Sequence, residues 1–232
     1  KAVIVTDYGG QPAEWVELKK LSKKHKFFLI NDNCHAMGSK YFGDRKYAIK
    51  YADFVIQSYH PVKTFTTGEG GSVLTNDIKF YKKIKSLRSH GIIRSEKDYW
   101  KYDIKELGYN YRLSDIHCAL GIKQLEKNEN GLKRRNEIAD TYKRAFEGKF
   151  KYQSLPINTY NAHHLFIIEV EARKDLFDYL KRQNIFAQIH YIPIHTLPYY
   201  KKIGYEDANL INAESYYSKC ISLPMFPSLT NL

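Results

Sequence analysis

Short apolar runs and amphipathic segments alternate over the first third of the chain. The short apolar runs, which have the length typical of buried strands, lie at 2–6, 27–30, 54–58 and 71–75. Between the first two, a single apolar stripe predicts a helix over 13–25; it consists of Trp15, Val16, Leu18 and Leu21. Strands separated by a helix predict an α/β sheet whose faces are covered by helices.

The pattern changes towards the end of the chain. Helices are predicted over 77–87, with Asn76 as the N-cap, and from 114 to 125, continuing into a long charged helix at 132–147. Beyond about residue 148, a smaller α+β domain is predicted from a strand at 165–170, a helix at 173–183 and a strand at 186–191. We therefore expect a large sheet domain at 1–130, and a small domain at 131–232 that includes the connecting helix.

Both ends of the sequence lie close to expected secondary structure. Lys1 directly precedes the first predicted strand, and the segment 223–230 is typical of the approach to a further helix. We expect the chain to be an excerpt of a longer protein, cut at both ends.

Composition narrows the class of protein. With 232 residues, 43% hydrophobic and 27% charged, the chain can build a core, and no apolar run is long enough for a membrane span. The net charge of +12 suits a polyanionic partner or a phosphorylated substrate, and equally a basic proteome with many solvated lysines. No nucleic-acid-binding motif accompanies that charge, and no histidine cluster has the spacing of a metal site. Three distant cysteines indicate reduced thiols in a cytoplasmic protein.

The segment 58–71 carries a lysine with the context of a reactive amine. Lys63 lies in a loop between two predicted strands, after Ser58 and before three glycines. Lysines in such loops can lose enough hydration to act as nucleophiles that form Schiff bases. The same residues also fit an ordinary surface lysine beside a glycine hairpin, and the pattern does not decide between the two.

A second polar cluster, at 32–36, also follows a predicted strand. Asp32 would therefore lie at the carboxyl edge of the sheet, where open α/β folds bind ligands. A carboxylate there can keep a ring nitrogen protonated, because an opposite charge raises the pKa of a base. Taken alone, Asp32 could equally be a helix N-cap.

Taken together, five ordered motifs resemble the DegT/DnrJ/EryC1/StrS family of pyridoxal-phosphate-dependent sugar aminotransferases. The motifs are Asp-x-x-His-Ala-x-Gly at 32–38, Ser-Tyr-His-Pro-Val-Lys at 58–63, Thr-Gly-Glu-Gly-Gly at 67–71, Arg-Ser-His-Gly at 88–91 and Gly-Tyr-Asn-Tyr-Arg-Leu-Ser-Asp at 108–115. The resemblance extends from residue 2 to about 230. It implies the aspartate aminotransferase fold, fold type I of pyridoxal-phosphate-dependent transferases.

The resemblance also implies a role for each residue of the site. Lys63 would hold the cofactor as a Schiff base and move the proton in catalysis. Asp32 would pair with the pyridine nitrogen, and His35 would lie near the ring and its phenolic oxygen. Ser58 would donate to the cofactor phosphate, and Asn110 would reach the phosphate in the neighbouring subunit of a homodimer. The family's phosphate-cradling turn and stacking aromatic residue have no counterpart in this chain.

The same resemblance suggests a substrate. Segments 7–10, 187–194 and 221–224 are most similar to the family branch that serves pseudaminic acid biosynthesis. That branch implies amino transfer, with glutamate as the donor, to C4 of a UDP-linked 4-keto-6-deoxy N-acetyl sugar. The expected sugar contacts are Ser58, Asn110, His190, Tyr191, Ile192 and Pro193.

Two other functions stay open on the sequence. The family also contains sugar dehydratases, but these have histidine in place of the Schiff-base lysine, so Lys63 argues against that activity. A regulatory or nucleic-acid-binding protein that kept the fold would instead show a salt-dependent affinity for DNA and bind no cofactor.

Overall fold

The computed structural model describes residues 1–154, 156–205 and 208–230. The chain separates into two compact units. Unit 1 consists of residues 1–130 and 157–162, and unit 2 consists of residues 131–156 and 163–232. The chain therefore passes from unit 1 to unit 2, returns briefly, and leaves again.

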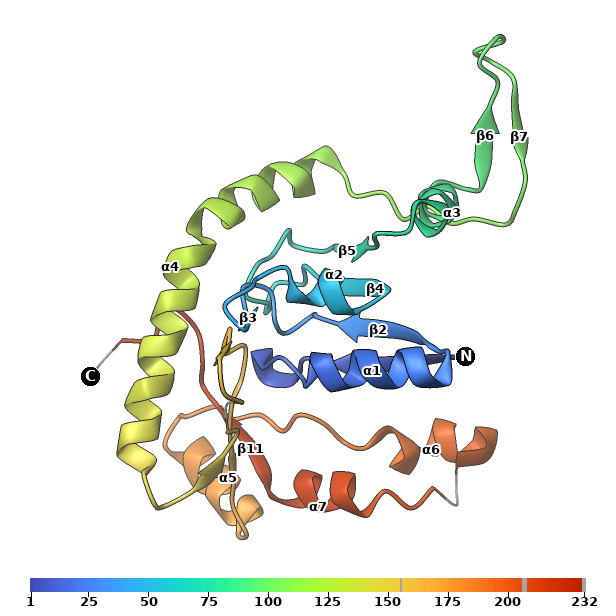
Figure 1. Ribbon diagram of the computed structural model, residues 1–232. Helices are drawn as coiled ribbons and strands as arrows, with labels where there is room; N and C mark the ends of the chain where they lie inside the picture. Colours follow the sequence, from blue (N-terminus) through green and yellow to red (C-terminus); the bar gives the residue numbers. More distant parts are fainter. Residues whose placement is uncertain (155, 206–207, 231–232) are drawn as a thin grey trace. The chain divides into compact units, whose positions relative to one another are not determined.

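Unit 1 is built on a mixed sheet with the strand order β1 (Ala2–Thr6), β2 (Phe28–Asp32), β4 (Phe54–Ser58) and β5 (Gly71–Leu74). The first three strands are parallel, and β5 is antiparallel to β4. The sheet and its helices are drawn in blue to cyan in Figure 1. The α/β class predicted from the apolar runs is confirmed.

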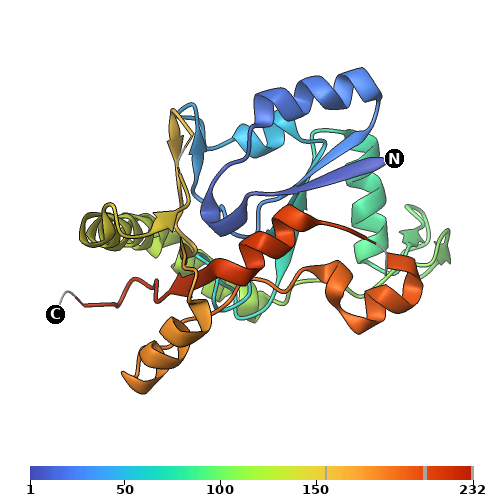
Figure 2. The same cartoon turned by 90° about the horizontal axis from the view of Figure 1, so that it is seen from below.

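Helices cover the two faces of this sheet. On one face, α1 (Trp15–His25) and α2 (Tyr47–Tyr51) pack on the strands, and the core consists of Trp15, Leu29, Tyr41, Tyr47, Ala48, Ala52 and Val55. On the other, Phe80 of α3 (Ile78–Arg88) contacts Phe28 and Phe54, at ring-centroid distances of 5.5 and 4.8 Å. Successive strand side chains point to opposite faces, so α3 lies across the sheet from α1 (Figure 2).

Two small sheets complete unit 1. β3 (Lys40–Tyr41) pairs with β9 (Thr159–Tyr160), which brings residues 157–162 back to this unit. β6 (Ile92–Arg94) and β7 (Tyr102–Ile104) form a hairpin that projects beyond α3 in Figure 1.

The helix α4 (Asp115–Phe146) is continuous for 32 residues, beginning in unit 1 and ending in unit 2. The prediction that the 114–125 helix continues into the charged helix is therefore confirmed. No helix in the described part of the chain is long and apolar enough to cross a membrane.

Unit 2 has its own sheet, with the strand order β11 (Cys220–Leu223), β10 (Phe166–Glu169) and β8 (Lys151–Tyr152). The helices of this unit after α4 are α5 (Arg173–Arg182), α6 (Pro198–Tyr200) and α7 (Ile211–Lys219). The buried core consists of Ile138, Ala139, Phe166, Ile168, Ala187, Ile221 and Met225.

A buried guanidinium ties together three segments of unit 2. The Nη1 atom of Arg135, on α4, donates to the carbonyl oxygens of His163, His164 and Met225 at 3.1, 3.3 and 2.8 Å. Burial lowers the pKa of this guanidinium to about 10. The three carbonyls replace the hydration that the cation loses.

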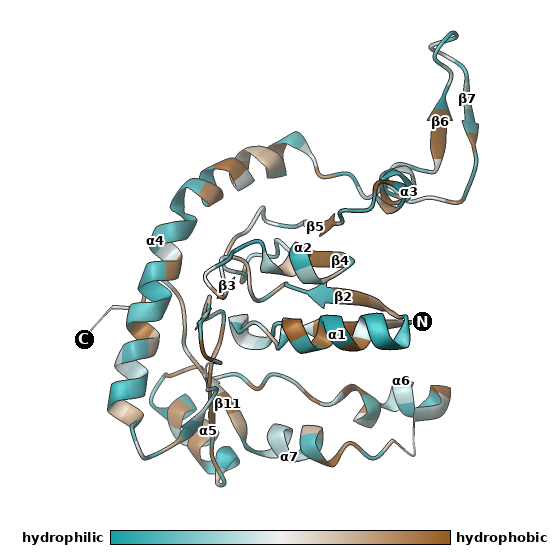
Figure 3. Ribbon diagram, in the orientation of Figure 1, coloured by the Kyte–Doolittle hydropathy of each residue, from teal (hydrophilic) through white to brown (hydrophobic). Residues whose placement is uncertain are grey.

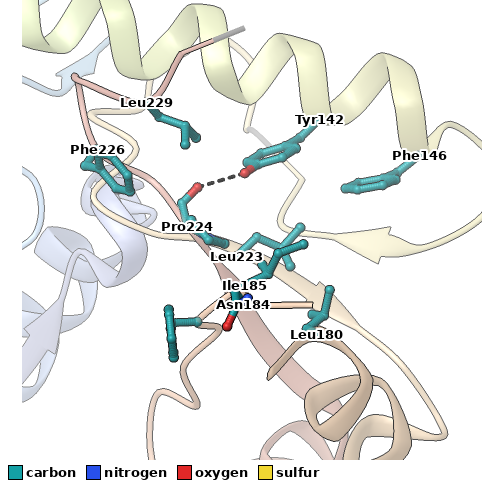
Figure 4. Close-up of a pocket in the computed structure, with 10 residues that line it drawn as sticks. Tyr142, Phe146, Leu180, Asn184, Ile185, Leu223, Pro224, Phe226 and Leu229 are labelled. Atoms are coloured by element: carbon teal, nitrogen blue, oxygen red, sulfur yellow. Dashed lines mark hydrogen bonds between the residues drawn. The ribbon is translucent and has the colours of Figure 1, made fainter. Parts of the chain in front are cut away.

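Beside this core lies an apolar cleft of about 460 Å³ (Figure 4). Across it, the hydroxyl of Tyr142 donates to the carbonyl oxygen of Pro224 at 2.9 Å. The cleft is lined by Tyr142, Phe146, Leu180, Asn184, Ile185, Phe186, Leu223, Pro224, Phe226 and Leu229.

Two local predictions are wrong. The N-cap of α3 is Asp77, whose carboxylate accepts from the amides of Lys79 and Phe80; the side chain of Asn76 donates instead to the carbonyl of Ile49. The expected strand at 186–191 forms only a single bridge, between Gln188 and Ser222.

Burial of His163 makes the stability of unit 2 sensitive to acid. Burial, followed by the nearby charge of Lys143, lowers the pKa of His163 to about 4, below its ordinary value of 6.5. Between those two values the unfolded chain binds a proton that the folded chain does not, so stability is lost as the pH falls. From pH 7 to pH 5 the loss from this group should be about 2 kcal/mol.

The variant His163→Asn tests this expectation, since asparagine tolerates the positive φ of 47° at this position. Urea unfolding of both proteins at pH 7 and pH 5 should show a smaller pH-dependent loss in the variant. Equal losses in the two proteins would contradict the assignment to His163.

Candidate functional site

Polar side chains gather where the three parallel strands of unit 1 end. Asp7 follows β1, Asp32 and His35 lie at the end of β2, and Ser58 and Lys63 lie at and after the end of β4. Because β1, β2 and β4 are parallel, these carboxyl ends share one edge of the sheet. This edge is where open α/β sheets bind ligands.

Asp32 is anchored within this edge by its neighbours. One of its carboxylate oxygens accepts from the amide of Cys34 at 3.1 Å, and the other from the hydroxyl of Thr6 at 3.5 Å. The bond to Cys34 closes a turn at the end of β2, so the alternative interpretation as a helix N-cap is wrong. Asp32 is half-buried, which leaves part of the carboxylate accessible to a ligand.

Lys63 lies in the loop that joins β4 to β5, with its amide donating to the carbonyl of His60 at 3.0 Å. Its side chain is half-buried, and burial lowers the pKa of its amine below the ordinary lysine value. The nearby thiol of Cys34 and carboxylate of Asp32 act in the opposite direction. The sequence left open an ordinary surface lysine, whereas the structure places this amine in a partly desolvated position beside a carboxylate.

Cys34 lies close enough to both charged groups to feel their charges. Burial, and then hydrogen bonding and charge from Asp32, raise the pKa of its thiol to about 12. The thiol therefore stays protonated at neutral pH and does not compete with Lys63 as a nucleophile.

The loop that carries Lys63 is held by its own hydrogen bonds. The amide of Tyr59 donates to the carbonyl of Gly70, and the hydroxyl of Thr66 donates to the carbonyl of Tyr59 at 2.8 Å. Gly70 has a φ of 146°, and a side-chain carbon there would lie 2.7 Å from Leu113. The glycines do form a hairpin-like connection, as one interpretation of the sequence had it, and this connection presents Lys63 at the sheet edge.

His35 is joined to the turn that follows β1. The amide of Gly9 donates to Nδ1 of His35 at 3.3 Å, and the rings of Tyr8 and His35 lie 6.1 Å apart. Gly9 has a φ of 68°, a conformation that favours glycine. His35 is buried.

Asp7 is the residue of this edge whose importance the sequence interpretation missed. Its side chain is fully buried and accepts five hydrogen bonds of 2.7–3.0 Å, from Ala13, Trp15, Asn31, Asn33 and Tyr47. Burial raises the pKa of Asp7, and the hydrogen bonds from Tyr47, Ala13, Asn31 and Asn33 oppose the shift. The signal was present, since Asp7 directly follows a strand predicted from the sequence, and Asp32 also lies after a predicted strand.

The remaining predicted site residues lie in three different parts of the structure. Ser58 ends β4, and its oxygen lies 3.4 Å from the amide of His60. Asn110 is exposed and bridges to Ser89; no contact described for it reaches Asp32, Ser58 or Lys63. The segment His190–Pro193 belongs to unit 2, where Nδ1 of His190 lies 2.8 Å from the hydroxyl oxygen of Ser222.

The sheet edge of unit 1 thus combines an amine with lowered pKa, a carboxylate, an imidazole and a hydroxyl. An amine can form a covalent bond to an aldehyde, a carboxylate can hold a protonated ring nitrogen, and a hydroxyl can donate to a phosphate. This set of donors fits pyridoxal phosphate.

Curated proteins of known function resemble the chain over nearly its whole length. It is 42% identical over 230 residues to the UDP-4-amino-4,6-dideoxy-N-acetyl-beta-L-altrosamine transaminase of Campylobacter jejuni strain 81-176, a match that covers 96% of the chain and 60% of the relative. The transaminase of the same name from Helicobacter pylori is 35% identical over 236 residues. That match covers 99% of the chain and 62% of the relative. The chain therefore spans about 60% of the length of these relatives.

Solved structures share the fold. PseC of Helicobacter pylori, an aminotransferase involved in the biosynthesis of pseudaminic acid, superposes with a TM-score of 0.92 at 34% identity, covering 99% of the chain and 62% of that structure. The pyridoxal-phosphate form of a sugar aminotransferase from Streptococcus pneumoniae superposes with a TM-score of 0.90 at 29% identity. This superposition covers 100% of the chain and 64% of that structure. The expected fold type is confirmed.

The sequence profile of the DegT/DnrJ/EryC1/StrS aminotransferase family matches residues 1–231. The five ordered motifs, the α/β sheet and the lysine at its carboxyl edge agree with that match. The chain belongs to the DegT/DnrJ/EryC1/StrS aminotransferase family.

Proposed function

We propose that the chain acts in a pyridoxal-phosphate-dependent transfer of an amino group, from glutamate, to C4 of a UDP-linked 4-keto-6-deoxy N-acetyl sugar. The observation that carries this proposal is the half-buried amine of Lys63 beside the Asp32 carboxylate at the sheet edge. The substrate class is supported by the names of the Campylobacter and Helicobacter relatives. A cytoplasmic location is part of the proposal and agrees with three cysteines that form no disulfide.

Each side chain of the edge has a task that its surroundings support. When bound, the cofactor supplies an aldehyde that captures amines and a ring that withdraws electrons. Lys63 would hold the cofactor through its amine, and Nζ would then carry a proton between carbon atoms of substrate and cofactor. The Asp32 carboxylate would hold the ring nitrogen in its protonated form. Ser58 can accept from the amide of His60 and still donate its hydroxyl proton to the cofactor phosphate.

We place the sugar contacts at Ser58, at Asn110 and at the segment 190–193. In that segment Tyr191 and Ile192 are exposed, and the His190 ring is oriented by Ser222. Exposed apolar and aromatic groups next to an oriented imidazole suit a ligand with both a ring and hydroxyl groups.

A homodimer is the third part of the proposal. The segment 99–125 exposes many apolar side chains, among them Tyr99, Leu107 and Ile116 at 87%, 88% and 83% of their surfaces. Figure 3 shows hydrophobic colour in the first turns of α4. Exposed apolar side chains of this kind are typical of an interface, and Asn110 lies within the same segment of the chain. A second copy of the chain that covers it would bring Asn110 to the neighbouring site.

Covalent mapping tests the central role of Lys63. Incubation with pyridoxal phosphate followed by borohydride reduction should add one cofactor to the peptide that contains Lys63. The variant Lys63→Arg should lose the label and at least ~10³-fold of the turnover, because a guanidinium does not readily give up its proton. A label on another lysine would contradict the proposed role.

The lowered pKa of Lys63 predicts a distinct pH dependence. Competitive labelling with acetic anhydride, followed by mass spectrometry, should show Lys63 becoming reactive at a lower pH than a lysine of ordinary pKa. In Asp32→Asn this pH should fall further, because the carboxylate raises the pKa of the amine. The opposite shift, or a Lys63 profile at the ordinary lysine pKa, would show that the amine is not in the environment described.

Mixed dimers test whether Asn110 acts across the interface. Asn110→Ala should weaken cofactor binding, because it removes an amide donor to a phosphate oxygen. In a dimer of one Asn110→Ala chain and one Lys63→Ala chain, one site would carry both lesions and the other neither. About half of the sites in such dimers should then be active. If the mixed dimers are shown to form and yet have no activity, Asn110 acts in the site of its own chain.

A further inference from the structure

The carboxylate of Asp7 has two oxygens that serve two different parts of the sheet edge. Oδ1 accepts from the amide of Ala13 and from the indole N–H of Trp15, both at 2.9 Å. Oδ2 accepts from the side-chain amides of Asn31 and Asn33 at 3.0 Å and from the hydroxyl of Tyr47 at 2.7 Å.

The Oδ1 side closes the loop that contacts His35. Residues 8–10 form a 3-10 turn, in which the amide of Gly10 donates to the carbonyl of Asp7. The bond from Ala13 to Oδ1 joins the far end of this loop to its first residue. The direction of the Gly9 N–H, which points to Nδ1 of His35, is therefore set within a closed ring of hydrogen bonds.

The Oδ2 side holds the residues that bracket Asp32. Asn31 and Asn33 precede and follow Asp32, and the amide of Asp7 also donates to the carbonyl of Asp32 at 3.0 Å. Asn31 points to the face of the sheet opposite to Asp32, because side chains alternate along a strand. Asp7 thus fixes the backbone on both sides of Asp32, and the carboxylate of Asp32 takes no part in these contacts.

The hydrogen bond from Gly9 also determines the proton position on His35. An N–H that donates to Nδ1 requires that nitrogen to carry no proton, so the neutral imidazole carries its proton on Nε2. In that form Nε2 is a hydrogen-bond donor.

We propose that Asp7 is a positioning residue, which holds His35 as the Nε2–H tautomer and fixes the backbone on both sides of Asp32. The inference rests on the proposed function only for its effect on cofactor binding. The geometry around His35 and Asp32 stands without it. Asp7 belongs to none of the five ordered motifs, and its role follows from the five donors that its carboxylate holds.

An asparagine at position 7 cannot serve both sets of donors. Its side chain has one acceptor oxygen, and its NH₂ group would face donors on the other side. Either the loop at 8–13 or the pair Asn31 and Asn33 would lose its anchor. The isosteric variant Asp7→Asn therefore separates the acceptor chemistry from the volume of the side chain.

Asp53→Asn is the matched control. The Asp53 carboxylate also anchors β2, accepting from the amide of Leu29 at 2.8 Å and from Lys19 at 3.4 Å, but at the opposite end of that strand. Its loss should lower stability without disturbing His35.

The experiment measures ¹⁵N chemical shifts of His35 in the chain without cofactor, and cofactor affinity separately. The native protein should show an unprotonated Nδ1 and a protonated Nε2 at pH 7–8. In Asp7→Asn the Nδ1–H form should appear and cofactor affinity should fall at least ~10-fold, while Asp53→Asn keeps the native pattern and an affinity within ~2-fold.

Other outcomes overturn the inference. A native His35 with its proton on Nδ1 would exclude the positioning role. It would also be excluded if Asp7→Asn left both the His35 spectrum and the cofactor affinity unchanged. If Asp7→Asn does not fold, Trp15→Phe removes one of the two donors on the Oδ1 side and should produce the same change in the His35 spectrum at smaller amplitude. An unchanged spectrum there would likewise exclude the positioning role. Failure of the native protein to bind cofactor would contradict the proposed function. The ¹⁵N chemical shifts of His35, measured without cofactor, would then alone decide the role of Asp7.

Discussion

The buried carboxylate of Asp7 is the interaction on which the order of unit 1 depends. A carboxylate without water is costly unless its oxygens accept hydrogen bonds, and here five donors supply them from β2, α1, α2 and the loops between them. Each donor is in turn fixed in place by the acceptor. Apolar packing of Trp15 and Tyr47 joins the same elements, but it is the polar centre that determines their register.

The chemistry of the sheet edge follows from the parallel arrangement of β1, β2 and β4. Parallel strands deliver the residues that follow them to one side, so Asp32, Cys34 and Lys63 meet although they are distant in the sequence. Partial burial then shifts the pKa values of Lys63 and Cys34 in opposite directions. The Lys63 amine becomes easier to deprotonate, while the Cys34 thiol becomes harder to ionise.

The sequence predicted what depends on local pattern and familiar motifs, and failed where tertiary contacts decide. The strands of unit 1 and the long α4 follow from apolar periodicity, and Lys63 and Asp32 from their place after strands. The strand expected at 186–191 had the right composition, but only Gln188 pairs with its neighbour. The hydrogen bonds of Asp7 join residues up to 40 positions apart, and no local pattern contains such information.

The return of residues 157–162 to unit 1 bears on how the protein is made. β9 pairs with β3, and the amide of Ala162 donates to the hydroxyl of Ser39 and to the carbonyl of Gly10, in the turn after Asp7. During synthesis β3, Ser39 and Gly10 cannot form these contacts until residue 162 has left the ribosome. Unit 1 therefore completes its fold only after α4 and the first strand of unit 2 have been made, and a fragment ended at residue 130 would leave β3 without its partner strand.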